Sequence, residues 1–157
     1  MSRRAQIQMS PEEVAAFLAG ERTVICATIG RDGFPHLMPL WYVVRGEDLW
    51  AWTFAKSQKV RNLERDPRAT LQVEAGTEYQ ELRGIMLKAD VTIHRKTDRV
   101  AELGVELLER HRAADQGEID DDVRAMVRAQ APKRVALQFH ERERATWDHR
   151  KLAAGVY

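Results

Sequence analysis

The sequence has very little cysteine and no long apolar run, and these two absences narrow the classes of protein that it can encode. Cys26 is the only cysteine among the 157 residues. A single thiol forms neither an intrachain disulfide nor a cysteine-rich zinc site. No segment approaches the roughly 20 consecutive apolar residues that a membrane helix needs. We therefore expect a soluble protein without a membrane partner, located in the reducing environment of the cytoplasm.

An excess of charge of one sign is also missing. The 25 lysines and arginines are balanced by 24 aspartates and glutamates, which leaves a formal net charge of +1. A protein dedicated to nucleic acid carries a basic excess because it must neutralise many phosphates. We therefore expect no nucleic-acid partner. The length, with 44% hydrophobic and 31% charged residues, predicts a single globular domain over residues 1–157.

Several motifs of catalysis and nucleotide binding are absent. The sequence contains neither a Gly-x-Gly-x-x-Gly nor a Walker-type loop, so a Rossmann or P-loop site is not indicated. The five histidines lack metal-ligand spacing, and no Gly-x-Ser-x-Gly elbow accompanies them, so no metal site or hydrolase is predicted. Cys26 lies in an apolar segment, where we expect it to pack as a small hydrophobic side chain rather than act as a nucleophile.

Residue periodicity and turn chemistry predict a mainly β fold with flanking helices. Helices are expected over residues 10–20, 57–65, 97–112 and 119–130, the first with a Ser-Pro-Glu-Glu capping box. Strands are expected over residues 23–29, 36–44, 49–54, 69–75, 82–94 and 134–147. Short turns join the first three strands, which predicts an antiparallel meander. About six strands in one sheet must curl to bury a face, which favours a small antiparallel barrel.

Pro39 interrupts the second predicted strand. Because proline has no N–H to give to the ladder, this position indicates an edge, a bulge or an opening in the sheet. Such an irregularity is a place to look for a ligand. His36 lies on the same strand, where it either lines a pocket or is simply a surface histidine.

Residues 56–68 form the segment with the most pronounced local charge, with five basic and two acidic residues. Ser57 is the expected N-cap of a helix, so free N–H groups, the positive helix end and Lys59 would converge on one point that suits a phosphate. Lys59 and Asn62 would share a helix face, whereas Lys59 and Arg61 would lie about 200° apart. The alternative is a basic helix whose charges are simply solvated, and the residues alone leave both interpretations open.

Four segments together resemble the flavin/deazaflavin oxidoreductase family related to pyridoxamine 5′-phosphate oxidase. They are Ala27–His36, Met38–Tyr42, Ser57–Arg68 and Trp147–Leu152. More narrowly, the chain is similar to the actinobacterial branch that uses the deazaflavin coenzyme F420. The resemblance covers nearly the whole chain, and it depends on the order and spacing of all four segments rather than on any one motif.

The resemblance implies an FMN-binding type of split β-barrel that forms a homodimer, with the cofactor in a groove at the interface. By position, it implies that the phosphate end of the cofactor contacts Ser57, Lys59, Arg61 and Asn62. It also implies that Met38, Pro39 and Thr53 lie along the tricyclic ring. Tyr79 and Trp147 would be contributed by the partner subunit.

The function implied by the resemblance is an F420-dependent reductase that transfers hydride to a small conjugated or quinone-like substrate. In such enzymes the cofactor carries the redox chemistry and the protein orients the reactants, so no side-chain nucleophile is expected. The chain lacks a second arginine-rich strand of the kind that grips pyridoxal phosphate, so oxidation of pyridoxamine phosphate is not expected. The alternatives are an FMN-binding oxidoreductase of the same fold and a non-catalytic flavin- or haem-binding protein.

Overall fold

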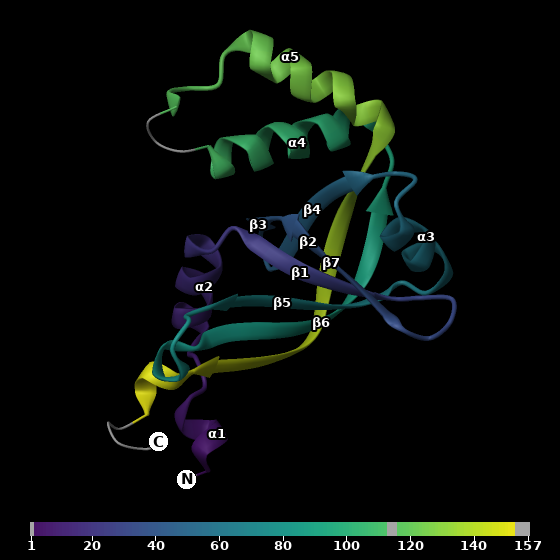
Figure 1. The fold of residues 1–157 in the computed structure, drawn as a ribbon. Coiled ribbons are helices and arrows are strands. Elements are labelled where there is room, and N and C mark those ends of the chain that lie inside the picture. Colours follow the sequence, from purple (N-terminus) through teal and green to yellow (C-terminus); the bar gives the residue numbers. More distant parts are fainter. Residues whose placement is uncertain (1, 113–115, 153–157) are drawn as a thin grey trace.

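The computed structural model describes residues 2–112 and 116–152, which form one antiparallel sheet with helices around it (Figure 1). The strands are β1 Thr23–Ile29, β2 Pro35–Trp41, β3 Val43–Arg45, β4 Asp48–Phe54, β5 Arg68–Ala75, β6 Arg83–His94 and β7 Arg134–Asp148. The α-helices are α1 Arg3–Gln6, α2 Pro11–Gly20, α3 Gln58–Arg65, α4 Thr97–His111 and α5 Asp121–Gln130. Short 3-10 turns cover Tyr79–Glu81, Ala131–Lys133 and His149–Lys151.

The sheet has the order β2-β1-β5-β6-β7-β4-β3 and curls into a barrel. Its two longest strands, β6 and β7, bend strongly (Figure 1), and their register shifts between Lys88 and Ala89. A β-bulge of this kind bends and twists a strand pair, which helps the sheet to close. β2 and β3 are the two edges, and β2 comes to lie beside β4 without a hydrogen-bonded ladder between them. We call the line between β2 and β4 the seam, and it makes the barrel a split one.

The interior of the barrel is the main hydrophobic core. It contains alternate residues of the strands together with one face of α2 and of α3, among them Val24, Leu71, Val73, Ile85, Leu87, Val135, Leu137 and Phe139, with Phe17 of α2 and Val60 and Leu63 of α3. Each fully buried side chain of this size contributes about 1.5–3 kcal/mol relative to exposure. Packing in the core therefore holds α3 against the end of the barrel.

A second hydrophobic cluster joins α4 to the outer face of β3, β4 and β7. It includes Trp50, Val100, Leu103 and Leu107, with Trp52 packed against it. Gly104 allows α4 to approach closely, because a Cβ atom there would lie 2.4 Å from Cζ3 of Trp52. In Figure 1, α5 lies on the far side of α4 from the sheet, so the two helices form a hairpin that projects from the barrel.

Local signals in the sequence are confirmed at the N-terminus of α2 and in the turn between β1 and β2. The backbone N–H of Ser10 donates to Oε2 of Glu13 at 2.7 Å, and the backbone N–H of Glu13 donates to Ser10 Oγ at 3.3 Å, which completes the capping box of α2. In the β1–β2 turn, Gly33 has a φ of 85°, a conformation that favours glycine. The β1–β2 hairpin follows as predicted.

The prediction that the first three strands form an antiparallel meander is wrong. The predicted strand 36–44 divides at Tyr42 into β2 and β3, which lie at opposite edges of the sheet, and the total is seven strands rather than about six. Tyr42 is fully buried, and its hydroxyl donates to the carbonyl of Leu18 at 2.7 Å. This anchor carries the chain across the seam, so β2 pairs with β1 and β3 pairs with β4.

Candidate functional site

Buried polar side chains gather at the end of the barrel that α3 covers. Among the described residues, the buried polar or charged side chains are Asp148 and a group of four from β1, β4 and α3, namely Thr28, Thr53, Lys59 and Asn62. Burying polar groups costs free energy unless they are hydrogen-bonded. A cluster of them inside a small barrel therefore marks a candidate functional site.

Two side-chain hydrogen bonds tie α3 to the strands. Nζ of Lys59 donates to Oγ1 of Thr53 at 2.9 Å, and Nδ2 of Asn62 donates to Oγ1 of Thr28 at 3.0 Å. Oδ1 of Asn62 accepts from Nε2 of Gln58 at 2.9 Å. Lys59 and Asn62 therefore share the inner face of α3, as their spacing predicts.

Lys59 is a buried cation without a counterion. No carboxylate among residues 2–112 and 116–152 forms an ion pair with it. Cys26 is close enough to interact, but burial raises the pKa of its thiol to about 12, so this group stays neutral. Burial also lowers the pKa of Lys59, because the charged form loses hydration. An anionic ligand at this position would supply the missing negative charge.

The N-terminus of α3 lacks the side-chain cap that its sequence predicts. Ser57 occupies the N-cap position, yet its side chain makes no capping hydrogen bond. Its Oγ is buried and has no partner in the described part of the chain. The first N–H groups of a helix have no intrahelical partner and, with the helix dipole, attract anions. The unpartnered hydroxyl of Ser57 and the free N–H groups of the helix end could therefore both bind a phosphate.

The opposite face of α3 carries a second group of basic residues. A cavity of about 670 Å³ is lined by Arg31, Gln58, Arg61, Glu64 and Arg65, and we call it the basic cavity. The guanidinium groups of Arg31 and Arg61 have no hydrogen-bond or ion-pair partner in residues 2–112 and 116–152. Glu64 is paired with Arg95, so it does not neutralise them. Because Arg61 and Lys59 lie on different sides of α3, they offer positive charge in two separate places.

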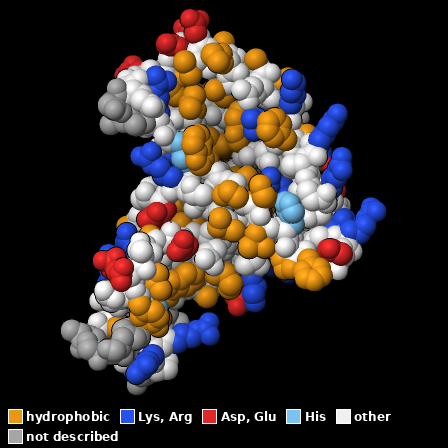
Figure 2. Space-filling model, viewed as in Figure 1, with side chains coloured by type: hydrophobic (Ala, Val, Ile, Leu, Met, Phe, Trp, Pro, Cys, Tyr) orange, Lys and Arg blue, Asp and Glu red, His pale blue; other side chains and the backbone are white. Residues whose placement is uncertain are grey.

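The seam brings Met38 and Pro39 beside the strand that carries Thr53. Met38 is 42% exposed. Pro39 lies on the edge strand β2, where it pairs with Ile25 of β1, and this confirms the expected edge position of the proline. His36 pairs with Thr28, and its Nδ1 is buried without a partner in the described residues. Figure 2 shows the surface hollowed between the α4–α5 hairpin and the barrel, with apolar side chains on both walls.

Tyr79 and Trp147 lie away from α3 in their own chain. The ring of Tyr79 packs 4.7 Å from that of His149, and Trp147 covers Gly84 on β6. Both belong to the end of the barrel that holds the C-terminal end of β7, at the bottom of Figure 1. Neither side chain joins the candidate site of the same chain.

A second cavity, on the other side of the sheet's strands β1 and β5 from the core, has a different chemistry. It measures about 800 Å³ and lies against strands β1, β2, β5, β6 and β7, lined by Ala27, Thr28, Ile29, Pro35, Leu37, Arg68, Ala69, Thr70, Lys88, Ala89, Arg142 and Glu143. Its three basic residues are all paired with carboxylates, since Arg68 contacts Asp66, Lys88 contacts Glu143, and Arg142 contacts Asp90. This cavity is therefore largely apolar and electrically balanced, unlike the surroundings of α3.

Residues 2–112 and 116–152 show neither a metal-binding cluster nor a membrane-spanning helix. They contain no group of three or more histidine, cysteine or acidic side chains placed to hold a metal ion. None of their helices has the length and apolar character needed to cross a bilayer.

Comparison with known proteins identifies the family. The family model described as pyridoxamine 5′-phosphate oxidase matches residues 10–147. The chain belongs to the pyridoxamine 5′-phosphate oxidase family. No curated protein matches the sequence.

Solved structures of similar fold accompany this match. A conserved hypothetical protein of Mycobacterium tuberculosis, Rv2991, is 38% identical with a TM-score of 0.85, and the match covers 99% of this chain and 98% of that one. An F420 reductase has a TM-score of 0.68 at 20% identity, over 87% of this chain and 98% of the other. A FAD-binding protein of Mesorhizobium loti has a TM-score of 0.65 at 17% identity, over 88% and 94%. The last two show the fold alone, which is that of the flavin and deazaflavin split barrels of the pyridoxamine 5′-phosphate oxidase family.

Some residues of the site were not singled out in the sequence. Arg31 and Arg65 complete the basic cavity, and Thr28 fixes Asn62. Nη2 of Arg65 donates to the carbonyl of Ile29 at 2.5 Å, which joins α3 to the end of β1. Arg65 lies within the basic segment and could have been found there. In this member of the pyridoxamine 5′-phosphate oxidase family, no local pattern relates Arg31 to α3, which begins 27 residues later.

Proposed function

We propose that this protein is an F420-dependent oxidoreductase whose cofactor is held at the N-terminus of α3. The observation that carries the proposal is the buried Lys59, which lacks a counterion in the described part of the chain and lies on the helix whose N-cap hydroxyl has no partner there. These groups fit the phosphate end of a flavin or deazaflavin. In this arrangement Ser57 and Lys59 contact the phosphate, and Asn62 holds α3 against β1 through Thr28.

The two-sided distribution of positive charge favours F420 over FMN. FMN ends in one phosphate, whereas F420 carries a phosphodiester and, beyond it, carboxylates. Lys59 on the inner face of α3 and Arg61 on the outer face would serve separate anionic groups, because side chains on different sides of a helix do not converge on one phosphate. The unpaired Arg31 and Arg61 of the basic cavity suit such an acidic extension.

The protein's own contribution to the reaction is orientation and exclusion of water. Bound F420 supplies a hydride that a small conjugated or quinone-like substrate accepts together with a proton. Met38 and Pro39 on β2 and Thr53 on β4 border the seam on its two sides, where they would position the tricyclic ring.

We also propose that the working unit is a homodimer in the cytoplasm. β2 exposes apolar side chains to an unusual extent, with Leu37 56% and Trp41 50% accessible, and Phe34 precedes it at 75%. Together with the mostly apolar cavity of about 800 Å³, which Leu37 lines, these residues form a surface that a second copy would cover. The unpaired thiol of Cys26 is consistent with a reducing compartment.

Titration of the protein with F420 and with FMN, followed by cofactor fluorescence, tests the proposal. We expect saturable binding of F420 in the micromolar range and weaker binding of FMN. Tighter binding of FMN would favour the flavin oxidoreductase of the same fold. If the purified protein carries haem, which its absorption spectrum reveals, and binds neither F420 nor FMN, the proposed function is wrong.

A further inference from the structure

Arg134 has no acidic partner in the described part of the chain, and it lies on the outer face of the sheet next to the segment that leads into α3. No carboxylate in the described residues forms an ion pair with it. Of its five N–H donors, only one at Nη2 has a partner among the described residues, the Oε1 atom of Gln130 at 2.9 Å. Nε is buried and lacks any partner in residues 2–112 and 116–152. The guanidinium therefore has donors to spare and no local negative charge.

Two aromatic rings fix the position of this guanidinium. Its Cζ lies 4.3 Å from the centroid of Trp52 and 4.1 Å from that of Phe54. The indole of Trp52 packs closely against Gly104 of α4, where an added Cβ atom would collide with it. Cation–π contacts of this kind hold the planar group flat, so a ligand would meet a group that is already ordered. Partial burial lowers the pKa of Arg134, as expected for a cation that lacks compensation.

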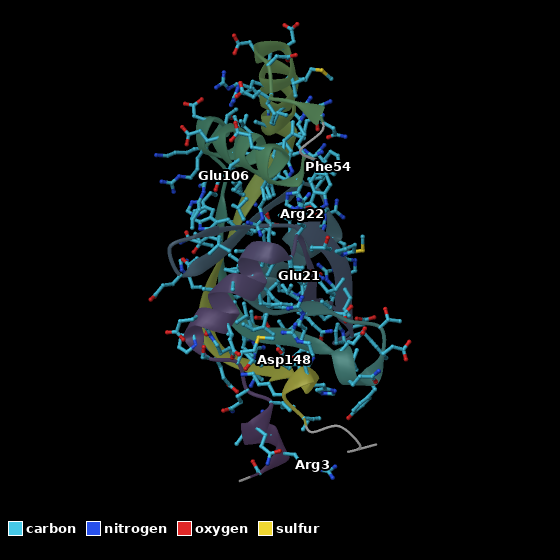
Figure 3. The ribbon with its side chains drawn as sticks, turned by 90° about the vertical axis from the view of Figure 1, so that its left-hand side faces the viewer. Arg3, Glu21, Arg22, Phe54, Glu106 and Asp148 are labelled. Carbon is cyan, nitrogen blue, oxygen red and sulfur yellow. The ribbon has the colours of Figure 1, made fainter. Side chains whose placement is uncertain are left out.

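The location of Arg134 separates it from the cofactor phosphate. It pairs across the sheet with Phe54, and the N–H of Ala55 donates to the carbonyl of Lys133 at 3.0 Å, so the start of β7 is tied to the segment that leads into α3. Side chains alternate along a strand, and Trp52 and Phe54 point away from the barrel interior that Thr53 and Lys59 face. In Figure 3, Phe54 lies near the α4–α5 hairpin, far from Asp148.

We propose that Arg134 binds a carboxylate of the substrate, and that the hydride acceptor is a planar conjugated carboxylic acid. The planar fork of arginine matches the two oxygens of a carboxylate. The ring of Phe54, which is 55% exposed, offers an apolar surface for the conjugated part of the same molecule. This assignment of substrate class rests on the proposed function, but the interaction of Arg134 with a carboxylate can be measured without turnover.

The test compares trans-cinnamate with trans-cinnamamide, two probes that share a conjugated double bond and differ in charge. Dissociation constants are measured by ligand-observed NMR on the full chain loaded with F420. The wild-type protein is expected to bind cinnamate at least about tenfold more tightly than the amide, the scale of a charge-assisted hydrogen bond. Arg134→Gln is expected to abolish this preference, and Arg134→Lys to keep part of it.

Arg128→Gln is the matched control, because Arg128 is an exposed arginine of α5 whose loss changes the net charge equally. It should keep the preference for cinnamate. Arg134→Lys preserves the charge, and it replaces Arg134→Gln as the test variant if Arg134→Gln does not fold. The proposal is overturned if the wild type binds both probes equally, if cinnamate shows no saturable binding in the millimolar range, or if Arg134→Gln keeps the preference.

Failure of the proposed function is distinguished by titrating F420 into the same preparations. If the wild-type protein does not bind F420, the proposed cofactor is wrong, and the cinnamate comparison on the free protein then tests Arg134 by itself. If F420 binds and the preference for cinnamate is absent, the substrate assignment fails while the cofactor assignment stands.

Discussion

Lys59 combines a structural cost with the proposed role in cofactor binding. Inside the barrel its ammonium group has one hydrogen bond, to Thr53, and no counterion in the described residues. A buried charge without a partner opposes folding. The free protein therefore carries a cost at this position that an anionic ligand would relieve, and binding energy and stability depend on the same residue.

We predict opposite effects of Lys59→Met on binding and on stability. The binding free energy for F420 should weaken by about 1.5–3 kcal/mol, the scale of a charge-assisted hydrogen bond. The free protein should become more stable at pH values below the range in which lysine ordinarily titrates. Fluorescence titration and urea unfolding measure the two effects. Lys56→Met, which removes an exposed lysine of the same segment, is the control and should alter both much less.

The pH dependence gives the same prediction a second readout. The pKa of Lys59 is lower in the folded chain than in the unfolded one, so the unfolded chain binds more protons between the two values. The contribution of Lys59 should therefore make the free wild-type protein more stable as the pH rises from the folded to the unfolded pKa of this lysine. Lys59→Met should lack that contribution. An equal pH dependence of the two proteins would contradict the assignment.

The helix α3 is anchored in the core but lacks a side-chain cap at its N-terminus. Val60 and Leu63 anchor its inner face in the core, and Asn62 bonds to β1. Its N-terminus, in contrast, has a serine at the cap position that makes no capping bond. α2 has the complete capping box that α3 lacks. The difference indicates that the free N–H groups of α3 are left for another partner.

Ser57→Ala should therefore cost the free protein less than about 0.5 kcal/mol, against the roughly 1 kcal/mol that loss of a working cap costs. It should nevertheless weaken F420 binding measurably. Ser10→Ala is the matched control, because this serine does cap α2, and it should destabilise the protein without changing affinity. Urea unfolding and cofactor titration separate the cases. A large loss of stability in Ser57→Ala with unchanged affinity would assign the serine to the helix alone.

On the scale of the whole molecule, the edge strand β2 is the least covered part of the barrel. Most of its side chains are exposed, although the strand is almost entirely apolar. Exposed edge strands invite pairing or coverage by another chain. The seam between β2 and β4 lies at the same place, so a second copy that covered β2 would also enclose the proposed cofactor groove.

Leu37→Asp should convert the proposed homodimer to a monomer and weaken F420 binding with it, because a carboxylate would be buried in the proposed apolar interface. Light scattering reports the mass, and fluorescence titration reports affinity. Met126→Asp is the matched control, since Met126 on α5 is 67% exposed and lies outside this surface. A wild-type protein that is monomeric at working concentration would refute the dimer.

Most of the elements could be predicted from the sequence because their signals are local. The capping box of α2, the turn at Gly33 and the alternation of Val135, Leu137 and Phe139 in β7 each depend on neighbouring residues. The division of residues 36–44 could not be predicted, because it depends on where the buried Tyr42 lies in the closed barrel.

The candidate site divides in the same way. The sequence by itself determined that residues 56–68 concentrate positive charge on a helix and that Lys59 and Arg61 face different sides, because helical geometry sets these angles. Only the tertiary structure decided that Lys59 points into the barrel without a counterion, that Arg31 joins Arg61, and that Arg134 lies over two aromatic rings. Each of these depends on contacts between segments far apart in the chain, which closure of the sheet brings together.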